Sequence, residues 1–179
     1  MKYAVCLVMA AVVACSSPSK KKLKDETDRL IRKSNQALLQ GNEDRKLIDS
    51  AFESVESFVA AYPDDTLTPA YLFEKALLQE KQRQYDQTLV TLERIYTSYP
   101  HSAQSSKALF LQGYLYANVL GDYDKARIKY QLYLDNYSDV DPKITRDVQM
   151  ELKNLGKTPD EILKEILEKS NADTTQVPV

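Results

Sequence analysis

A tyrosine-containing dipeptide recurs along this chain at nearly constant intervals. Tyr62-Pro63 returns as Tyr99-Pro100 and then as Tyr137-Ser138, so the repeat is 37 residues long from position 63 to 100 and 38 from 100 to 138. Periods of this size are typical of proteins in which similar units stack side by side, because one unit alone cannot bury its apolar surface. The repeat therefore favours an elongated stack in which each unit contacts its neighbours.

The spacing of apolar residues indicates that every unit is helical. From Leu23 onward apolar residues recur every three or four positions, and the alternation typical of a half-buried strand is absent. The helix before each dipeptide repeats its bulky and small residues at four positions, counted back from the second residue of the dipeptide. These are Phe58, Ile95 and Tyr133 at five, Val55, Leu92 and Tyr130 at eight, Ala51, Thr88 and Ala126 at twelve, and Ile48, Tyr85 and Tyr123 at fifteen. We expect the small residues to admit a neighbouring helix and the bulky ones to fill the space between hairpins.

Glycine, proline and capping residues set the limits of eight expected helices. Thr68 is expected to cap the third helix with Pro69 in its first turn, and Thr158 with Glu161 forms a capping box for the eighth. The expected helices run from Leu23 to about Gly41, from Ile48 to Tyr62, from Thr68 to at least Leu77, from Asp86 to Tyr99, from Ser102 to Gly121, from Asp122 to Tyr137, from Asp141 to Gly156, and from Thr158 to Leu167.

The third unit carries a more specific pattern of small and aromatic residues, namely Gly113, Tyr116, Gly121, Tyr123, Ala126 and Tyr130. Their order resembles the tetratricopeptide repeat, although the second unit lacks both glycines and the first matches only in its second helix. The resemblance implies an all-α fold, a tetratricopeptide-like right-handed helical solenoid of about three helix hairpins plus a C-terminal capping helix pair from Asp141 to Leu167. A closed helix bundle, in which the repeat is coincidental, is the alternative.

The first residues of the chain have the pattern of an export sequence. Lys2 precedes a short apolar run from Tyr3 to Val13, and Cys15 follows small residues and precedes a polar stretch. The run is shorter than the ~20 residues needed to span a bilayer. The pattern resembles the lipobox of bacterial lipoproteins, which implies lipidation of Cys15; a plain secretory signal with an incidental cysteine is the alternative.

The lipobox and the repeat together divide the chain into four parts. We expect a lipoprotein signal peptide at 1–14, a lipidated tether at 15–22, a tetratricopeptide-like helical repeat domain at 23–169 and a disordered tail at 170–179. Acyl chains on Cys15 would hold the protein on a membrane, because each buried CH₂ contributes roughly 0.8 kcal/mol. The nearby basic run is either attracted to anionic head groups or is a solvated linker; its members are Lys20, Lys21, Lys22 and Lys24.

A lipobox followed by hairpins that end in Tyr-Pro resembles the repeat lipoproteins of the bacterial envelope. The most similar are the BamD-like lipoproteins of the outer-membrane β-barrel assembly machine, and the coordinator of the Tol–Pal system is also similar. The resemblance implies a lipid-anchored scaffold on the periplasmic face of the cell outer membrane, which binds envelope proteins such as a barrel-assembly component. A coordinator of cell-wall enzymes or of the Tol–Pal system is the alternative function.

The sequence offers little catalytic chemistry. Once Cys6 leaves with the signal peptide and Cys15 carries lipid, no thiol remains, and His101 is the single histidine, so neither a triad nor a histidine-based metal site can form. A net charge of −2 also argues against a nucleic-acid partner. We therefore expect no enzyme activity, no metal, no cofactor and no small-molecule substrate. The alternative is an envelope enzyme whose acids are Asp64, Asp65 or Glu80.

Partner binding is expected on the first helix of each hairpin. In tetratricopeptide stacks this helix lines a groove, and the 37-residue period relates Phe73 to Phe110 and Leu77 to Tyr114. With Lys107, these residues form the expected partner-binding groove, and large apolar side chains on such a face suit a peptide or a partner helix. The alternative is that they belong to the hairpin core. The repeated tyrosines Tyr62, Tyr99 and Tyr137 are expected to join hairpins rather than to bind a partner.

Overall fold

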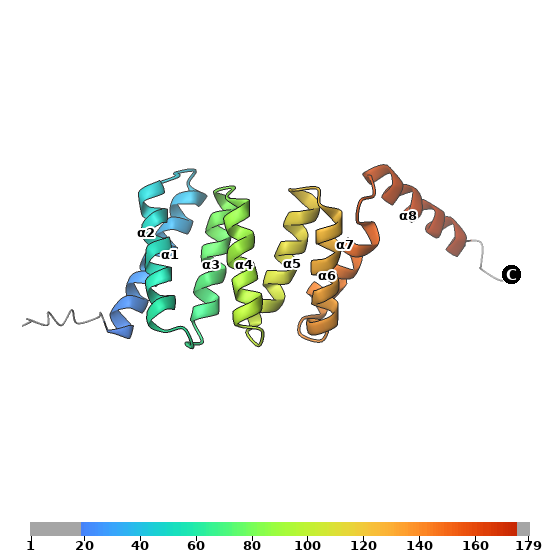
Figure 1. Ribbon diagram of the computed structural model, residues 1–179. Coiled ribbons are helices and arrows are strands. Elements are labelled where there is room, and N and C mark those ends of the chain that lie inside the picture. The colour runs from blue at the N-terminus through green and yellow to red at the C-terminus, as the bar shows by residue number, and fades with distance from the viewer. Residues whose placement is uncertain (1–18, 175–179) are drawn as a thin grey trace, which may run out of the picture.

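The computed structural model describes residues 19–174, and all regular structure in this range is helical (Figure 1). Cys15 and the expected signal peptide lie outside the described residues. The helices are α1 (Lys20–Leu39), α2 (Arg45–Ala61), α3 (Thr68–Lys81), α4 (Tyr85–Ser98), α5 (Ala103–Asn118), α6 (Tyr123–Tyr137), α7 (Pro142–Asn154) and α8 (Pro159–Thr174).

The helices form a row of hairpins, as the repeat predicts. The pairs α1/α2, α3/α4 and α5/α6 stand side by side along one axis, and α7 packs on α6 (Figure 1). The first and third hairpins lie at opposite ends of the row, whereas a closed bundle would bring them together. The all-α helical-repeat solenoid is therefore confirmed. At the far end α8 projects away from the row and makes few contacts with the other helices.

The core is built from the repeated positions of the second helices. The nine residues five, eight and twelve places before the repeat's end are all fully buried: Phe58, Ile95, Tyr133, Val55, Leu92, Tyr130, Ala51, Thr88 and Ala126. The fourth set differs, because Ile48 is buried while Tyr85 is half-buried and Tyr123 is exposed. Most of these residues fall into one cluster that runs from the first hairpin to α5 and a second across α5, α6 and α7.

Several helix starts follow the expected capping chemistry. Asp122 accepts a hydrogen bond from the Lys125 amide, and Asp141 accepts one from the Ile144 amide. In the predicted capping box the Thr158 amide donates to Glu161 Oε2 at 2.7 Å, and the Glu161 amide donates to Thr158 Oγ1 at 3.3 Å. These side chains satisfy amides that the helix itself leaves unpaired.

The prediction that Thr68 caps α3 is wrong. Leu67 occupies the capping position, and Thr68 is the first helical residue. Its hydroxyl donates backwards to the Tyr62 carbonyl at 2.6 Å, while Asp65 Oδ1 accepts from the Leu67 amide at 2.9 Å. The turn between the first and second hairpins is thus closed by two side chains that each bond to the backbone of the loop.

Other boundaries also differ from the expected ones, since α2 begins at Arg45 rather than at Ile48. α1 begins at Lys20, so Lys20–Lys22 belong to the first helix rather than to the tether. α8 continues to Thr174 and so includes the first residues of the expected disordered tail. Ser19 accounts for the earlier start, since its side chain accepts a hydrogen bond from the Lys22 amide and caps α1. Between residues 19 and 174, no helix is both long and apolar enough to span a bilayer.

Candidate protein-binding groove

The predicted groove residues lie on the first helices of the second and third hairpins. Phe73 and Leu77 are on α3, and Lys107, Phe110 and Tyr114 are on α5. Lys107 and Tyr114 are exposed, and the other three are half-buried. Phe73 and Phe110 each lay part of the ring against a core cluster. Fully buried neighbours such as Leu72 and Leu109 form the core on these helices, so the five predicted side chains lie at its outer edge.

The surface of α3 beside α1 is bridged by polar side chains. Lys81 Nζ donates to Asn35 Oδ1 at 2.8 Å, and Asn35 Nδ2 donates to Glu74 Oε2 at 3.5 Å. These bonds join the first helices of the first two hairpins across the surface where Leu77 lies. Phe73 and Leu77 are not among the residues that line the hollow at Phe110 and Tyr114.

Phe110 and Tyr114 instead line a groove between α5 and α7. Its volume is about 420 Å³. The lining residues, which define what we call the α5–α7 groove, are Phe110, Leu111 and Tyr114 from α5 and Asp147, Met150 and Glu151 from α7. Tyr114 is 42% exposed and Met150 is 61% exposed. The groove thus presents an aromatic and a thioether side chain together to solvent, and adjoining apolar side chains of this kind are typical of protein-binding surfaces.

A buried tyrosine of α6 supports the groove from beneath. The Tyr130 ring lies 6.3 Å from the Phe110 ring, centroid to centroid, and is fully buried. Its hydroxyl has no hydrogen-bond partner among the described residues. Burial, followed by the nearby Glu151 and Tyr114, raises the pKa of this hydroxyl above its ordinary value. An unpaired donor therefore lies close to the groove carboxylate Glu151.

The groove is lined by negative charge on its α7 side. Asp147 and Glu151 are half-buried and one helical turn apart. No hydrogen bond or ion pair joins either carboxylate to another described residue. By contrast, Glu56 and Glu93 on the second helices are both paired with cations. A cation or a hydrogen-bond donor stabilises a half-buried carboxylate, so the groove is suited to a positively charged group.

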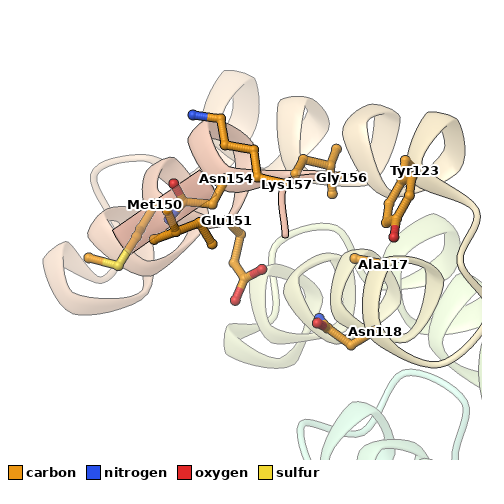
Figure 2. Close-up of a pocket in the computed structure, with 10 residues that line it drawn as sticks. Ala117, Asn118, Tyr123, Met150, Glu151, Asn154, Gly156 and Lys157 are labelled. Atoms are coloured by element: carbon orange, nitrogen blue, oxygen red, sulfur yellow. The ribbon is translucent and has the colours of Figure 1, made fainter. Parts of the chain in front are cut away.

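A second hollow continues from the groove toward α8. It has a volume of about 260 Å³. Its lining residues are Ala117 and Asn118 of α5, Tyr123 of α6, Met150, Glu151 and Asn154 of α7, Leu155, Gly156 and Lys157 of the following loop, and Ile162 of α8. In Figure 2, Glu151 lies between Met150 and the two α5 residues. Met150 and Glu151 line both hollows, so the accessible surface is continuous from Phe110 to the start of α8.

The acids considered for an enzyme have structural partners or lie apart. Asp65 accepts from the Leu67 amide and pairs with Lys20, and these two partners hold the pKa of its carboxyl below the usual range. Asp64 is exposed in the same loop, and Glu80 is on α3. His101 is exposed between α4 and α5, as expected. Among the residues that the structure describes, no three His, Cys, Asp or Glu side chains are grouped as a metal site would require.

A comparison with known protein families gives a match in the hairpins α3/α4 and α5/α6. The family model described as tetratricopeptide repeat matches residues 70–102 and 107–139, which cover most of α3/α4 and α5/α6. The chain contains tetratricopeptide repeats. Comparison with curated proteins and with solved structures gives no match. The predicted groove residues all fall within the matched tetratricopeptide repeats, while Asp147, Met150 and Glu151 follow the second one.

The three α7 residues of the groove were not predicted from the sequence. The 37-residue period relates Phe110 to Asp147 and Tyr114 to Glu151, so the register pointed to them. The expectation that Asp141 to Leu167 forms a capping pair places α7 outside the groove, and the structure differs in this respect. In the structure α7 occupies the place of another first helix and completes the groove that α5 begins.

Proposed function

We propose that this protein is a lipid-anchored scaffold of the bacterial envelope that binds another protein in the α5–α7 groove. The observation that carries the proposal is the groove itself, which is apolar, open and formed by a tetratricopeptide repeat and the helix after it. Tetratricopeptide repeats act as protein-interaction scaffolds, and large exposed apolar side chains in a groove suit a partner helix or peptide. The anchor is Cys15, on the strength of the lipobox-like residues before it.

The proposed place of action is the periplasmic face of the outer membrane, and the proposed partner is a component of β-barrel assembly. Both rest on the resemblance of a lipobox followed by Tyr-Pro hairpins to BamD-like lipoproteins. Mass spectrometry of the mature protein tests the anchor. We expect acyl chains on Cys15, and we expect Cys15→Ser to leave the membrane fraction. An unmodified Cys15 in the membrane-extracted protein would contradict the anchoring.

Photo-crosslinking in living cells tests the docking surface. A photoreactive phenylalanine analogue at Phe110 is expected to capture an envelope protein, because this position lines the groove. The matched control is Ile128, an exposed apolar residue on α6 that is not in the groove, where we expect no capture of the same protein. Equal capture from both positions, or none from Phe110, would contradict groove binding. Capture of a cell-wall enzyme or a Tol–Pal component instead of a barrel-assembly protein would replace the proposed partner.

A further inference from the structure

The chemistry of the α5–α7 groove restricts what can bind there. Phe110, Tyr114 and Met150 offer apolar surface, while Asp147 and Glu151 stand one turn apart beside it and form no ion pair with another residue that the structure describes. A segment that buried its apolar side here without neutralising the carboxylates would leave two charges desolvated, which is costly. A favourable occupant therefore needs apolar side chains and positive charges close together.

A second observation at the same place points to a polar contact. The fully buried Tyr130 hydroxyl has no hydrogen-bond partner among the described residues, and its ring lies 6.3 Å, centroid to centroid, from the Phe110 ring that lines the groove. Buried hydroxyls are usually hydrogen-bonded. An occupant that repositions Glu151 would give this hydroxyl an acceptor, so binding would satisfy a group that the free protein leaves unpaired.

We infer that the α5–α7 groove receives a basic amphipathic helix of a partner protein, whose lysine or arginine side chains pair with Asp147 and Glu151. This inference rests on the proposed function of the groove as a docking surface. A helix suits the site because its side chains at i and i+4 lie about 5–6 Å apart, which matches two carboxylates that are themselves four residues apart on α7. Its apolar side would contact the aromatic residues of α5 and Met150.

The protein's own α8 does not have this chemistry. Between Pro159 and Thr174 it carries five acids, Asp160, Glu161, Glu165, Glu168 and Asp173, against two bases, Lys164 and Lys169. An α8 from a second copy would therefore bring negative charge to a negative groove. This repulsion makes a basic segment of a different protein the better occupant.

Fluorescence anisotropy with the full-length protein tests the inference. The probe is a labelled synthetic amphipathic helix with leucines on one side and lysines flanking them, and its twin carries glutamate at every lysine position. We expect the lysine peptide to bind and the glutamate peptide not to bind. The double variant Asp147→Asn/Glu151→Gln is expected to weaken binding about tenfold or more, because hydrogen bonds to charged groups are lost.

A further double variant separates a built site from general charge attraction. Asp86→Asn/Asp124→Asn removes the same net charge from exposed positions on α4 and α6 and should leave the affinity within about twofold. Circular dichroism melting confirms that each variant is folded.

The inference is overturned if both peptides bind equally, if neither binds, or if the control pair weakens binding as much as the groove pair does. Self-association of the protein through the groove, detected by sedimentation and abolished by Asp147→Asn/Glu151→Gln, would also overturn it. These outcomes can be distinguished from one that contradicts the proposed scaffold function. Crosslinking from Phe110 to an acidic or uncharged segment of an envelope protein would keep the proposed function and reject the basic helix.

Discussion

At the scale of single residues, the close approach of α5 and α6 depends on the absence of one side chain. Gly113 lies on α5 directly over the Tyr130 ring, and a Cβ built at this position would lie 2.4, 2.5 and 2.9 Å from three ring atoms. Such distances are far below van der Waals contact. Because the ring is fully buried, it has no free space to move into. The glycine thus fixes how Tyr130 supports Phe110 beneath the groove.

We expect Gly113→Ala to destabilise the protein. In an open helix this change stabilises by about 1 kcal/mol, since alanine is the better helix former. Here the clash with Tyr130 costs ~1–3 kcal/mol, so the net effect is a loss of about 1 kcal/mol in the free energy of unfolding. Urea unfolding measures it. The control is the double variant Gly113→Ala/Tyr130→Leu, whose free energy of unfolding should fall by less than the sum of the falls in the two single variants. If Gly113→Ala alone were more stable than the unchanged protein, the Tyr130 ring would be free to move.

Two tyrosines of α6 give a comparison, because the half-buried Tyr137 has hydrogen-bond partners for its hydroxyl and the fully buried Tyr130 has none among the described residues. The Tyr137 hydroxyl donates to the Pro100 carbonyl at 2.7 Å and lies 2.9 Å from Ser105 Oγ, so it joins the third hairpin to the loop before it. Tyr137→Phe should therefore cost about 1 kcal/mol. Tyr130→Phe removes a hydroxyl without a partner and should leave stability unchanged or raise it slightly. Urea unfolding measures the free energy of unfolding of both variants. An equal decrease in the two would mean that the Tyr130 hydroxyl has a hydrogen-bond partner.

At the scale of elements, charged bridges tie each second helix to the next. Glu56 on α2 accepts from Arg94 on α4 at 2.9 Å and from Lys75 on α3 at 2.6 Å. One repeat later, Glu93 on α4 accepts from Lys129 on α6 at 2.7 Å. Since Glu56 and Glu93 are 37 positions apart, the ion pairs repeat with the fold.

Acid should remove the stabilisation that Glu56 provides. Burial raises the pKa of its carboxyl, but hydrogen bonds from Lys75 and Arg94 outweigh this, so the pKa lies below the usual range. A carboxyl with a lowered folded-state pKa stabilises the fold above its unfolded pKa, about 4.3, and this stabilisation is lost as the pH falls through the folded pKa. Solvent screening limits it to about 0.5–1 kcal/mol.

We therefore expect Glu56→Gln to reduce the free energy of unfolding by about 0.5–1 kcal/mol at pH 7 and by progressively less below about pH 4. Urea unfolding at several pH values measures the difference. The control is Glu53→Gln, which removes an exposed charge from the same helix and should change little at any pH. A loss for Glu56→Gln that stayed constant down to pH 3 would mean that packing, rather than charge, is responsible.

The helices themselves could be predicted from the sequence because the repeated apolar positions and the capping residues are local. Asp122, Asp141 and the Thr158–Glu161 box cap as expected. Thr68 could not be placed correctly, since its hydroxyl bonds to Tyr62 in the preceding loop and only the folded turn brings the two together. The exposure of Tyr123 likewise depends on α8, which does not fold back over it as a second helix would.

At the scale of the whole molecule, the two ends of the row differ. The outer surface of α1 is exposed and charged, with Lys21, Lys22, Asp25, Glu26 and Arg29. The far end is apolar, since Leu163, Ile166 and Leu167 of α8 are each more than half exposed. The number of hairpins can be predicted from the repeat. Whether α8 packs on the row or projects from it depends on contacts between α7 and α8. The α7 residues that line the α5–α7 groove were missed for the same reason, because they belong to this end.

In a row of hairpins each unit is stabilised by its immediate neighbours, so the sparse contacts of α8 have a measurable consequence. Removing the chain after Lys157 should leave the free energy of unfolding of the stack within about 1 kcal/mol of the full-length value. Ending the chain before Asp141 also removes α7, whose Val148 is fully buried in the second core cluster. That truncation should cost about 3 kcal/mol or more, because burying each such side chain contributes ~1.5–3 kcal/mol.

Hydrogen exchange on the full-length protein provides the independent measurement. Amides of α8 should exchange well before those of α3 to α6, because few buried contacts oppose local opening of this helix. If α8 instead exchanges as slowly as α6, or if its removal costs as much as removal of α7, then α8 packs on the stack in solution. In that case Leu163, Ile166 and Leu167 would be covered, and the hollow that links α8 to the α5–α7 groove would be closed to a partner.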